Sequence, residues 1–240
     1  MNQRQSKIFD PANSVACLTS GGLDSVVLLF YLKKQYKYIY PIYIKTGLNY
    51  ETAEIYHLKK IIDHDNREEF KPLTILNFDV RDLYTNHWGI NGTNIPGYDS
   101  NDESVYLPGR NIILFSKLGV WCYLNNINNI ACGHLKGNPF ADASENFIEL
   151  MEKCLSSGLN FDINIIRPFI NNEKFEIINL LKNIPLETSF SCINPKLNSK
   201  GVYIHCGQCN KCAERIRAFQ KASITDKTIY YTSIDTCTQK

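Results

Sequence analysis

The chain has 240 residues, of which 44% are hydrophobic and 21% are charged, a balance that suits one globular domain with at most a small appendage. Its net charge of +2 excludes a strong overall basic field that would draw it to nucleic acid. No run approaches the roughly 18 consecutive apolar residues of a membrane helix. The polar residues 1–14 also lack the apolar core of a signal peptide, so we expect a cytoplasmic protein without a membrane segment.

Short apolar runs alternate with helical patterns along most of the chain. We expect strands at 14–19, 38–45, 72–79, 128–133 and 163–169. We expect helices at 22–34, 49–64, 110–127, 142–157 and 172–183. Alternating strands and helices are typical of βαβ units. The sequence therefore predicts an α/β, Rossmann-like fold with a five-stranded, mainly parallel sheet and helices on both faces.

Three segments depart from this regular pattern. Residues 81–109 are polar and rich in turn residues, and a long stretch of this kind is usually functional or mobile. The helix at 110–127 is apolar nearly all round, so we expect it to be well buried. From residue 184 turns and cysteines replace the alternation, with one short helix at 212–222. We therefore divide the chain into an α/β domain at 1–183 and a small subdomain at 184–240.

The junction of the first strand and helix carries the string "SGGLDS", from Ser20 to Ser25. The first β–α junction of an open parallel sheet is a favoured anion site, because free N–H groups of the helix point at it. Gly21 and Gly22 let the backbone approach a phosphate and adopt positive φ, and the two serines offer hydroxyl donors. Asp24 fits if it holds Mg²⁺ or caps the helix.

This string is neither a Walker A nor a dinucleotide-binding pattern, and an isolated glycine pair would be read as a turn with an aspartate cap. The full string resembles the PP-loop of the ATP pyrophosphatase superfamily. That resemblance implies a PP-loop ATPase fold and ATP with Mg²⁺ as ligands. It also implies attack of a substrate oxygen on the α-phosphate, with release of pyrophosphate and later of AMP. It places residues 20–25 at the phosphates, namely Ser20, Gly21, Gly22, Leu23, Asp24 and Ser25.

Four of the nine cysteines lie close together near the end of the chain. Cys206, Cys209 and Cys212 form two overlapping CxxC steps, and Cys192 is the nearest candidate for a fourth ligand. A site of four cysteines with no open position is usually structural zinc, which would stabilise a segment too poor in apolar residues to fold alone. A redox CxxC, iron–sulfur ligation and His205 as an alternative ligand are the rival interpretations. For His205 an ordinary surface position is the better expectation.

The remaining cysteines are scattered, and an odd total in a chain without a signal argues against a disulfide framework. Cys17, Cys122, Cys132 and Cys154 lie in apolar or helical surroundings, which predicts that they are small core residues. Cys237 belongs to neither group.

A PP-loop near the start and a C-x13-C-x2-C-x2-C cluster near the end form a narrow combination. Together with "LPGRN" at 107–111, "GNPFADASENF" at 137–147 and "RPFINNEKFEII" at 167–178, it resembles the 7-cyano-7-deazaguanine synthase (QueC) family over nearly the whole chain. The resemblance implies a ligase that adenylates 7-carboxy-7-deazaguanine and aminates it with ammonia. A second adenylation then gives the nitrile, preQ0, which feeds queuosine-type modification.

The resemblance also assigns roles to individual residues. Asp24, Arg110 and Lys174 are the implied catalytic residues, the last two as cations that neutralise phosphate charge. Asn111 and Asp142 are placed at the substrate, where Asp142 would accept from the guanine-like edge. Arg110 can otherwise be a surface cation and Lys174 a helix-start lysine, and Asp142 is equally well explained as a helix N-cap. The family often forms dimers, so the resemblance also implies a homodimer as one possible assembly.

One segment departs from the family pattern. Members commonly carry a Tyr-Gly-Gln-Arg-His-like run after the second strand, and residues 45–54 read "KTGLNYETAE" without the Arg-His pair. This leaves open a divergent QueC-like enzyme that adenylates another acid or conjugates a deazaguanine to a protein in a defence system. Transfer of sulfur to tRNA is less favoured, because four cysteines already suit a metal. A non-enzymatic zinc module would leave the PP-loop unexplained.

Overall fold

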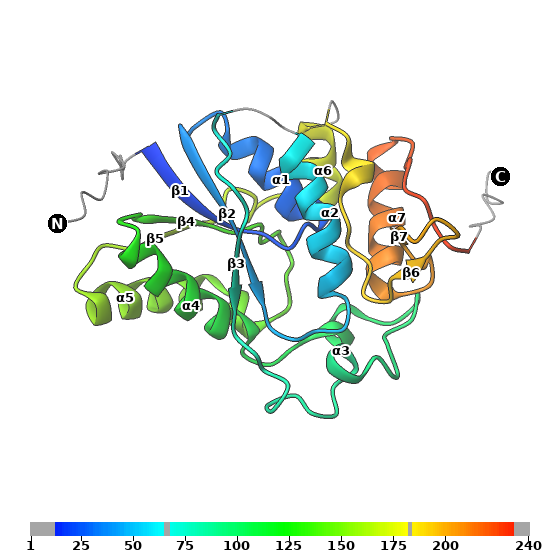
Figure 1. The fold of residues 1–240 in the computed structure, drawn as a ribbon, viewed down its shortest axis with the longest axis horizontal. Coiled ribbons are helices and arrows are strands. Elements are labelled where there is room, and N and C mark those ends of the chain that lie inside the picture. Colours follow the sequence, from blue (N-terminus) through cyan, green and yellow to red (C-terminus); the bar gives the residue numbers. More distant parts are fainter. Residues whose placement is uncertain (1–12, 65–67, 182–183, 233–240) are drawn as a thin grey trace.

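The computed structural model describes residues 13–64, 68–181 and 184–232, and its centre is a five-stranded sheet. The strand order is β3-β2-β1-β4-β5, and all four neighbouring pairs run parallel (Figure 1). The predicted parallel α/β sheet is therefore confirmed. The strands are β1 (Ser14–Leu18), β2 (Tyr38–Lys45), β3 (Thr74–Asn77), β4 (Asn129–Ala131) and β5 (Asn164–Ile166).

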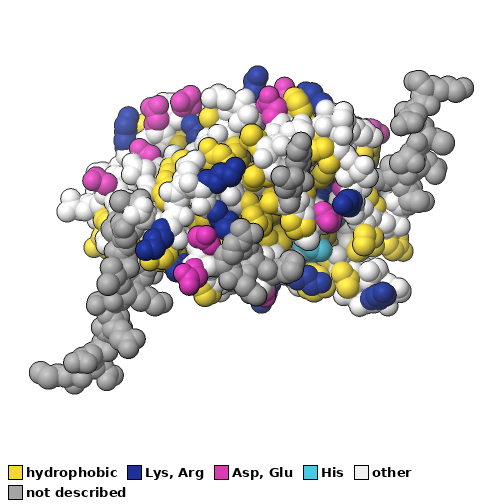
Figure 2. Space-filling model, turned by 90° about the horizontal axis from the view of Figure 1, so that it is seen from above, with side chains coloured by type: hydrophobic (Ala, Val, Ile, Leu, Met, Phe, Trp, Pro, Cys, Tyr) yellow, Lys and Arg dark blue, Asp and Glu magenta, His cyan; other side chains and the backbone are white. Residues whose placement is uncertain are grey.

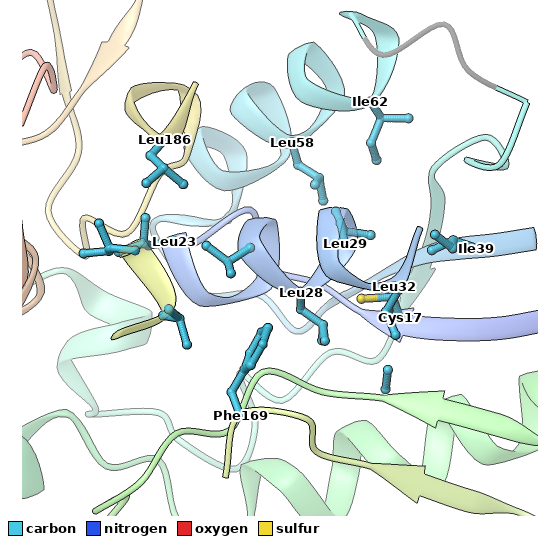
Figure 3. Close-up of a cluster of buried hydrophobic side chains, with 14 of the residues drawn as sticks. Cys17, Leu23, Leu28, Leu29, Leu32, Ile39, Leu58, Ile62, Phe169 and Leu186 are labelled. Atoms are coloured by element: carbon cyan, nitrogen blue, oxygen red, sulfur yellow. The ribbon is translucent and has the colours of Figure 1, made fainter. Parts of the chain in front are cut away.

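Helices cover both faces of this sheet, as expected. Figure 1 shows α4 (Arg110–Leu124) and α5 (Glu145–Leu159) on one face, with α1 (Leu23–Leu32), α2 (Glu51–His64) and α6 (Lys174–Leu180) on the other. The period of two along β1 divides its side chains between the layers: Val15 and Cys17 join the cluster on the α1 side, and Ala16 joins the α4 side. Figure 3 shows the α1-side cluster, in which Leu28 of α1, Leu58 of α2 and Phe169 converge.

The order of the strands decides where a ligand can bind. β1 is followed by α1 on one face, and its neighbours β2 and β4 lie on opposite sides of it. The connections out of β1 and β4 therefore diverge and leave a crevice at the carboxyl ends of these strands, which is the usual ligand site of an open α/β sheet. The "SGGLDS" string begins at this crevice.

Two expectations about the middle of the chain were wrong. α4 is not buried all round, because Ile112, Val120, Tyr123 and Leu124 on its outer face are 46–73% exposed. The region 81–109 is not structureless either. It contains α3 (Trp88–Asn91) and a 3₁₀ turn at Asp102–Val105, whose ends are closed by side-chain caps from His87 and Asn101.

The segment after residue 184 packs against the sheet domain. It carries a short hairpin, β6 (Lys196–Leu197) with β7 (Tyr203–Ile204), a 3₁₀ turn at Leu186–Thr188, and α7 (Asn210–Ala222). Phe219 of α7 belongs to the same apolar cluster as Leu23 and Leu28 of α1. The Phe190 amide also donates to the Gly21 carbonyl at 2.7 Å. The cysteine-bearing segment is thus tied directly to the PP-loop, and its boundary near residue 184 stays a prediction.

The surface agrees with the small net charge. On the face seen in Figure 2, basic and acidic side chains are interspersed without a large field of one sign. Among the described residues, no helix combines the length and the apolar character that are needed to cross a bilayer.

Candidate functional site

The loop between β1 and α1 has the geometry of an anion site. Gly21 adopts a φ of +77°, whereas Gly22 has an ordinary φ of −64°, so only the first glycine uses the conformation expected of both. Gly22 is the N-cap of α1, and no side chain caps this helix end. Asp24 therefore does not cap the helix, and the amides of the first turn face the crevice without a side-chain partner.

The two serines of the loop fix its shape. The Ser25 hydroxyl donates to the Gly22 carbonyl at 3.0 Å, and Ser20 Oγ accepts from the Gly22 amide at 3.2 Å. A Cβ on Gly21 would lie 3.1 Å from the Glu54 carbonyl oxygen and 3.2 Å from Leu58 Cβ, so α2 packs closely on the loop. The loop is preorganised by its own hydroxyls and by α2 before any ligand binds.

Asp24 faces a lysine from the other end of the chain. Lys174 Nζ lies 3.1 Å from Asp24 Oδ2 and 2.5 Å from Glu214 Oε1. Lys211 Nζ reaches the other oxygen of Glu214 at 2.8 Å. The start of α6 and the first turns of α7 thus bring two cations and one carboxylate to Asp24 of α1, beside the PP-loop.

The pKa values in this group follow from burial and from the neighbouring charges. Burial opposes the charge of Lys174, but the carboxylates of Asp24 and Glu214 outweigh it and raise the pKa of the lysine. Burial also opposes ionisation of Glu214, yet Lys174 and Lys211 lower its pKa to about 2. Burial raises the pKa of Asp24, against the opposing influence of Lys174. Lys174 is therefore protonated at neutral pH. Its positive charge offsets only part of the effect of burial on the neighbouring carboxyl group of Asp24.

A cleft of about 310 Å³ opens next to the PP-loop, a size within the range of small-molecule sites. Several buried side-chain polar atoms on its wall have no hydrogen-bond partner. Because most buried polar groups in folded proteins are paired, this concentration marks a wall that a polar ligand would complete. The unpartnered atoms are Thr19 Oγ1, Asp24 Oδ1, Arg110 Nε, His134 Nδ1 and Ser191 Oγ.

Arg110 begins α4 directly after Gly109, whose φ of +73° starts the helix. It lines the same cleft as Glu54 of α2. Burial opposes its charge, but the nearby Tyr50 and Glu54 outweigh this effect and raise its pKa. Glu54 is itself only 7% exposed, and Tyr43 Oη donates to its Oε2 at 2.6 Å. Arg110 is thus a partly buried cation on the cleft wall, with its Nε buried and unpartnered.

Asn111 and Asp142 hold each other at the edge of the cleft. The Asn111 amide donates to Asp142 Oδ2 at 2.9 Å, and Asn111 Nδ2 donates to the Asp142 carbonyl at 3.0 Å. Asp142 therefore satisfies the N-terminus of α4, whereas Ser144 is the N-cap of the helix that follows it, α5. Asp142 is therefore not the N-cap of α5, and its side chain instead accepts from an amide in the first turn of α4.

Aromatic pairs line the same cleft. Tyr106 and Phe140 stack with ring centroids 4.9 Å apart, and Tyr50 and Trp88 stack at 6.2 Å. Flat aromatic walls are suited to a planar heterocycle. Tyr50 lies in the stretch 45–54, where this sequence lacks the Arg-His pair of the family pattern.

The four cysteines meet at one buried point. Their sulfur atoms lie within 4.8 Å of one another, with two Sγ–Sγ separations of 3.9 Å. A tetrahedral site with zinc–sulfur bonds of about 2.3 Å has edges of about 3.8 Å, so the spacing suits a metal ion. Backbone amides of Asn194, Cys206 and Gln208 donate to the sulfurs, as expected for thiolates. The predicted set of Cys192, Cys206, Cys209 and Cys212 is therefore brought together.

Two single-residue expectations, one next to this cluster and one on α5, were wrong. His205 is 2% exposed and its Nε2 accepts from the Ser191 amide at 3.2 Å, so it is neither a surface residue nor a fourth ligand. Cys17, Cys122 and Cys132 are buried as expected, but Cys154 is exposed on α5. Cys237 lies outside the described residues.

Several residues of the site were not found from the sequence. Glu54, His134, Lys211 and Glu214 line the cleft or contact Lys174, but no local pattern marks them. Burial is the main cause that lowers the pKa of His134 to about 4, and Arg167 adds to it. Lys211 and Glu214 flank Cys212, and this position could have marked them as site residues. The cysteine cluster fixes the start of α7, and therefore the direction in which their side chains point.

The parallel sheet, the uncapped loop after β1 and the cation-lined cleft define a PP-loop ATPase. The chain belongs to the QueC family, described as queuosine biosynthesis protein QueC, whose family model matches residues 14–223. A 7-cyano-7-deazaguanine synthase of Methanococcus maripaludis is 32% identical, over 89% of this chain and 97% of the relative. One from Pyrococcus horikoshii is 28% identical, over 89% and 95%. The family suggested by the sequence motifs is thus confirmed.

Comparison with solved structures supports the fold. A 4-thiouridine synthetase, solved with RNA and bound ATP, superposes with a TM-score of 0.50 at 16% identity. The match covers 88% of this chain and 50% of that chain. At this identity the likeness concerns the fold alone.

Proposed function

We propose that this protein is a 7-cyano-7-deazaguanine synthase, which converts 7-carboxy-7-deazaguanine, ammonia and ATP to the nitrile with release of AMP and pyrophosphate. The observation that carries the proposal is the cleft itself. It joins an uncapped helix N-terminus, the two partly buried cations Arg110 and Lys174, and a set of unpartnered polar atoms. The names of the curated relatives favour this activity over conjugation to a protein and over tRNA thiolation.

The PP-loop side of the cleft would bind ATP. Backbone amides at the start of α1 and the hydroxyls of Ser20 and Ser25 would contact the phosphates. Lys174 and Arg110 would neutralise the charge that develops on the α-phosphate and the leaving pyrophosphate. Asp24 has one buried oxygen without a partner, so its carboxylate fits an Mg²⁺ ion held between protein and phosphates. Such an ion supplies further neutralisation of phosphate charge when bound.

The opposite side of the cleft would bind the acid. The Tyr106–Phe140 pair offers a flat surface for the deazapurine ring, and Asp142 lies beside it on the cleft wall. A carboxylate accepts from the ring N–H and the exocyclic amine of a guanine-like edge. Asp142 would then accept hydrogen bonds both from the first turn of α4 and from the substrate.

The cysteine cluster would hold a structural zinc ion. Four buried sulfur ligands leave no open coordination position, which is typical of a structural rather than a catalytic site. α7 begins one residue after Cys209 and carries Glu214 against Lys174. The metal would fix the part of α7 that supports the ATP side of the cleft.

A direct assay tests the activity. The purified protein is incubated with ATP, Mg²⁺, the deazaguanine acid and an ammonium salt, and the products are read by mass spectrometry. Formation of the nitrile with two AMP per product supports the proposal. AMP release only with another acid or with a protein acceptor would contradict it. Metal analysis of the same preparation should find one zinc per chain and no iron.

A further inference from the structure

Glu54 is a buried carboxyl group on the wall of the catalytic cleft. It lies on α2, is 7% exposed, and shares the cleft with Arg110 and the PP-loop. The turn of α2 that carries it packs directly on the loop, since a Cβ on Gly21 would lie 3.1 Å from the Glu54 carbonyl oxygen. Glu54 is therefore placed at the junction of the ATP side and the acceptor side.

A neighbouring glutamate shows what a purely structural carboxylate looks like in this chain. Glu51, one turn earlier on α2, is 2% exposed and accepts three hydrogen bonds from the loop after β2. These come from the Thr46 amide, the Thr46 hydroxyl and the Gly47 amide, and Glu51 does not line the main cleft. Glu54 accepts one side-chain hydrogen bond, from Tyr43 Oη at 2.6 Å, which orients its carboxyl group. Its place on the cleft wall is not explained by support of a loop.

The proposed reaction needs a group that removes protons from nitrogen twice. In the first half, ammonium gives up a proton, and the resulting ammonia attacks the acyl-adenylate carbon. A C–N bond forms, the C–O bond to AMP breaks with its electron pair on AMP, and the nitrogen releases a second proton to solvent. In the second half, the amide oxygen attacks the α-phosphate of a second ATP, pyrophosphate leaves, and the nitrogen releases one proton to solvent. The resulting imidoyl adenylate then loses its remaining N–H proton as the C–O bond to AMP breaks and the nitrile forms.

We propose that Glu54 is the general base that accepts these nitrogen protons, an inference that rests on the proposed function. Its carboxyl group is held by Tyr43, its backbone packs on the PP-loop, and it lines the same cleft as the guanidinium of Arg110, whose charge acts on it. A base in this position would take the proton from ammonium and later from the imidate nitrogen, and would return each to solvent.

The charged and titratable groups around Glu54 suit this task. Burial raises its pKa to about 8, while Arg110 of α4 and the hydrogen bond from Tyr43 of β2 act in the opposite direction and Glu51 adds to the rise. Tyr50 lies close enough that Glu54 contributes to raising its pKa, after burial. A base is most effective when its pKa lies near the working pH.

The decisive experiment uses the amide of the deazaguanine acid as substrate with ATP, because nitrile formation from the amide needs no ammonium. We expect Glu54→Gln to slow this step by about 100-fold or more, the usual range for loss of a general base. Adenylation of the acid, followed as exchange of pyrophosphate into ATP, should stay within a few-fold of wild type. The wild-type rate should rise with pH through about 8, and the variant should lose that rise.

Two further variants keep the test interpretable. Tyr43→Phe removes the hydrogen bond that lowers the pKa of Glu54, so the pH profile of nitrile formation should move to higher pH. Glu51→Gln should lower stability and affect exchange and nitrile formation equally, because Glu51 supports the loop.

Three outcomes would overturn the inference. In the first, Glu54→Gln retains nitrile formation. In the second, it loses exchange and nitrile formation to the same extent, which would make Glu54 a residue of adenylation or of structure. In the third, the profile of Tyr43→Phe does not move. A wild-type enzyme that performs the exchange but makes no nitrile would refute the proposed function as well, and the two failures are thus distinguishable.

Discussion

The cleft beside the PP-loop and the cysteine cluster lie next to each other, but they are completed in opposite ways. The cleft leaves Asp24 Oδ1, Arg110 Nε and His134 Nδ1 buried without partners. In the cluster, four sulfurs converge at metal-binding distance and backbone amides donate to them. Buried polar groups cost free energy unless they are satisfied. One region is therefore built to receive a changing ligand and the other to hold a permanent one, with α7 as the link between them.

The strongest test of the cleft is Asp24→Ala. We expect AMP release to fall by about 100-fold or more, because the variant removes the carboxylate that we propose to hold Mg²⁺ at the phosphates. Thermal unfolding should change little, since Glu214 still holds Lys174 at 2.5 Å. AMP formation measured by chromatography checks the first expectation. Asp79→Ala is the matched control, because Asp79 is an exposed aspartate that pairs with Arg81 away from the cleft. Equal turnover in both variants would refute a catalytic role of Asp24.

The strongest test of the cluster is Cys209→Ser. Loss of one ligand should release the metal and lower the free energy of unfolding by several kcal/mol, on the order of 10 °C in Tm. Activity should fall in parallel because α7, which carries Glu214, begins next to Cys209. Metal content and calorimetry measure both effects. Cys154→Ser should change neither, since Cys154 is exposed on α5. A fully active, metal-free variant would show that the two regions are independent.

Arg215 of α7 tests the link between the two regions. It is 1% exposed and donates to Thr228 Oγ1, Ser189 Oγ and the Leu186 carbonyl at 2.8–2.9 Å. Arg215→Met should lower the free energy of unfolding by about 3 kcal/mol, because it removes three buried hydrogen bonds at about 1 kcal/mol each. Urea denaturation is the measurement. Arg217→Met should cost less than about 0.5 kcal/mol, because Arg217 is half exposed on the same helix.

The pH dependence of stability probes the buried acid of the cleft. Because burial raises the pKa of Glu54 to about 8, its protonated form stabilises the folded state at low pH. This contribution is complete below the ordinary pKa of 4.5 and is lost as the pH rises through 8. We expect Glu54→Gln to lose less stability than wild type between pH 6 and pH 9 in denaturant titrations. Parallel curves for the two proteins would show that Glu54 titrates normally.

The smallest expected effects come from two glycines. Gly109 starts α4 at the cleft with a φ of +73° and has no close contact, so Gly109→Ala should cost about 1 kcal/mol through backbone strain alone. Gly158 lies in the last turns of α5 with open space around it, and Gly158→Ala should stabilise the protein by about 0.5–1 kcal/mol. Chemical denaturation of both variants measures the difference. Changes of the same sign would contradict this account.

Local patterns determined much of this protein from the sequence. The alternation of apolar strands and amphipathic helices predicted the parallel sheet, and "SGGLDS" marked the PP-loop because its glycines and hydroxyls lie within six residues. The CxxC spacing predicted three of the four metal ligands, and Cys192 followed as the nearest remaining cysteine. These features depend on neighbours in the chain, which the sequence states directly.

The tertiary structure alone decided which distant side chains face these motifs. It placed Glu214 against Lys174, Asp142 at the start of α4 and Glu54 beside the PP-loop. It also left one face of α4 exposed and buried His205, against the sequence-based expectations. The physical reason is that charge, burial and pKa depend on what packs across an interface between elements. Spacing along the chain fixes which face of a helix a residue occupies, and only packing fixes what that face meets.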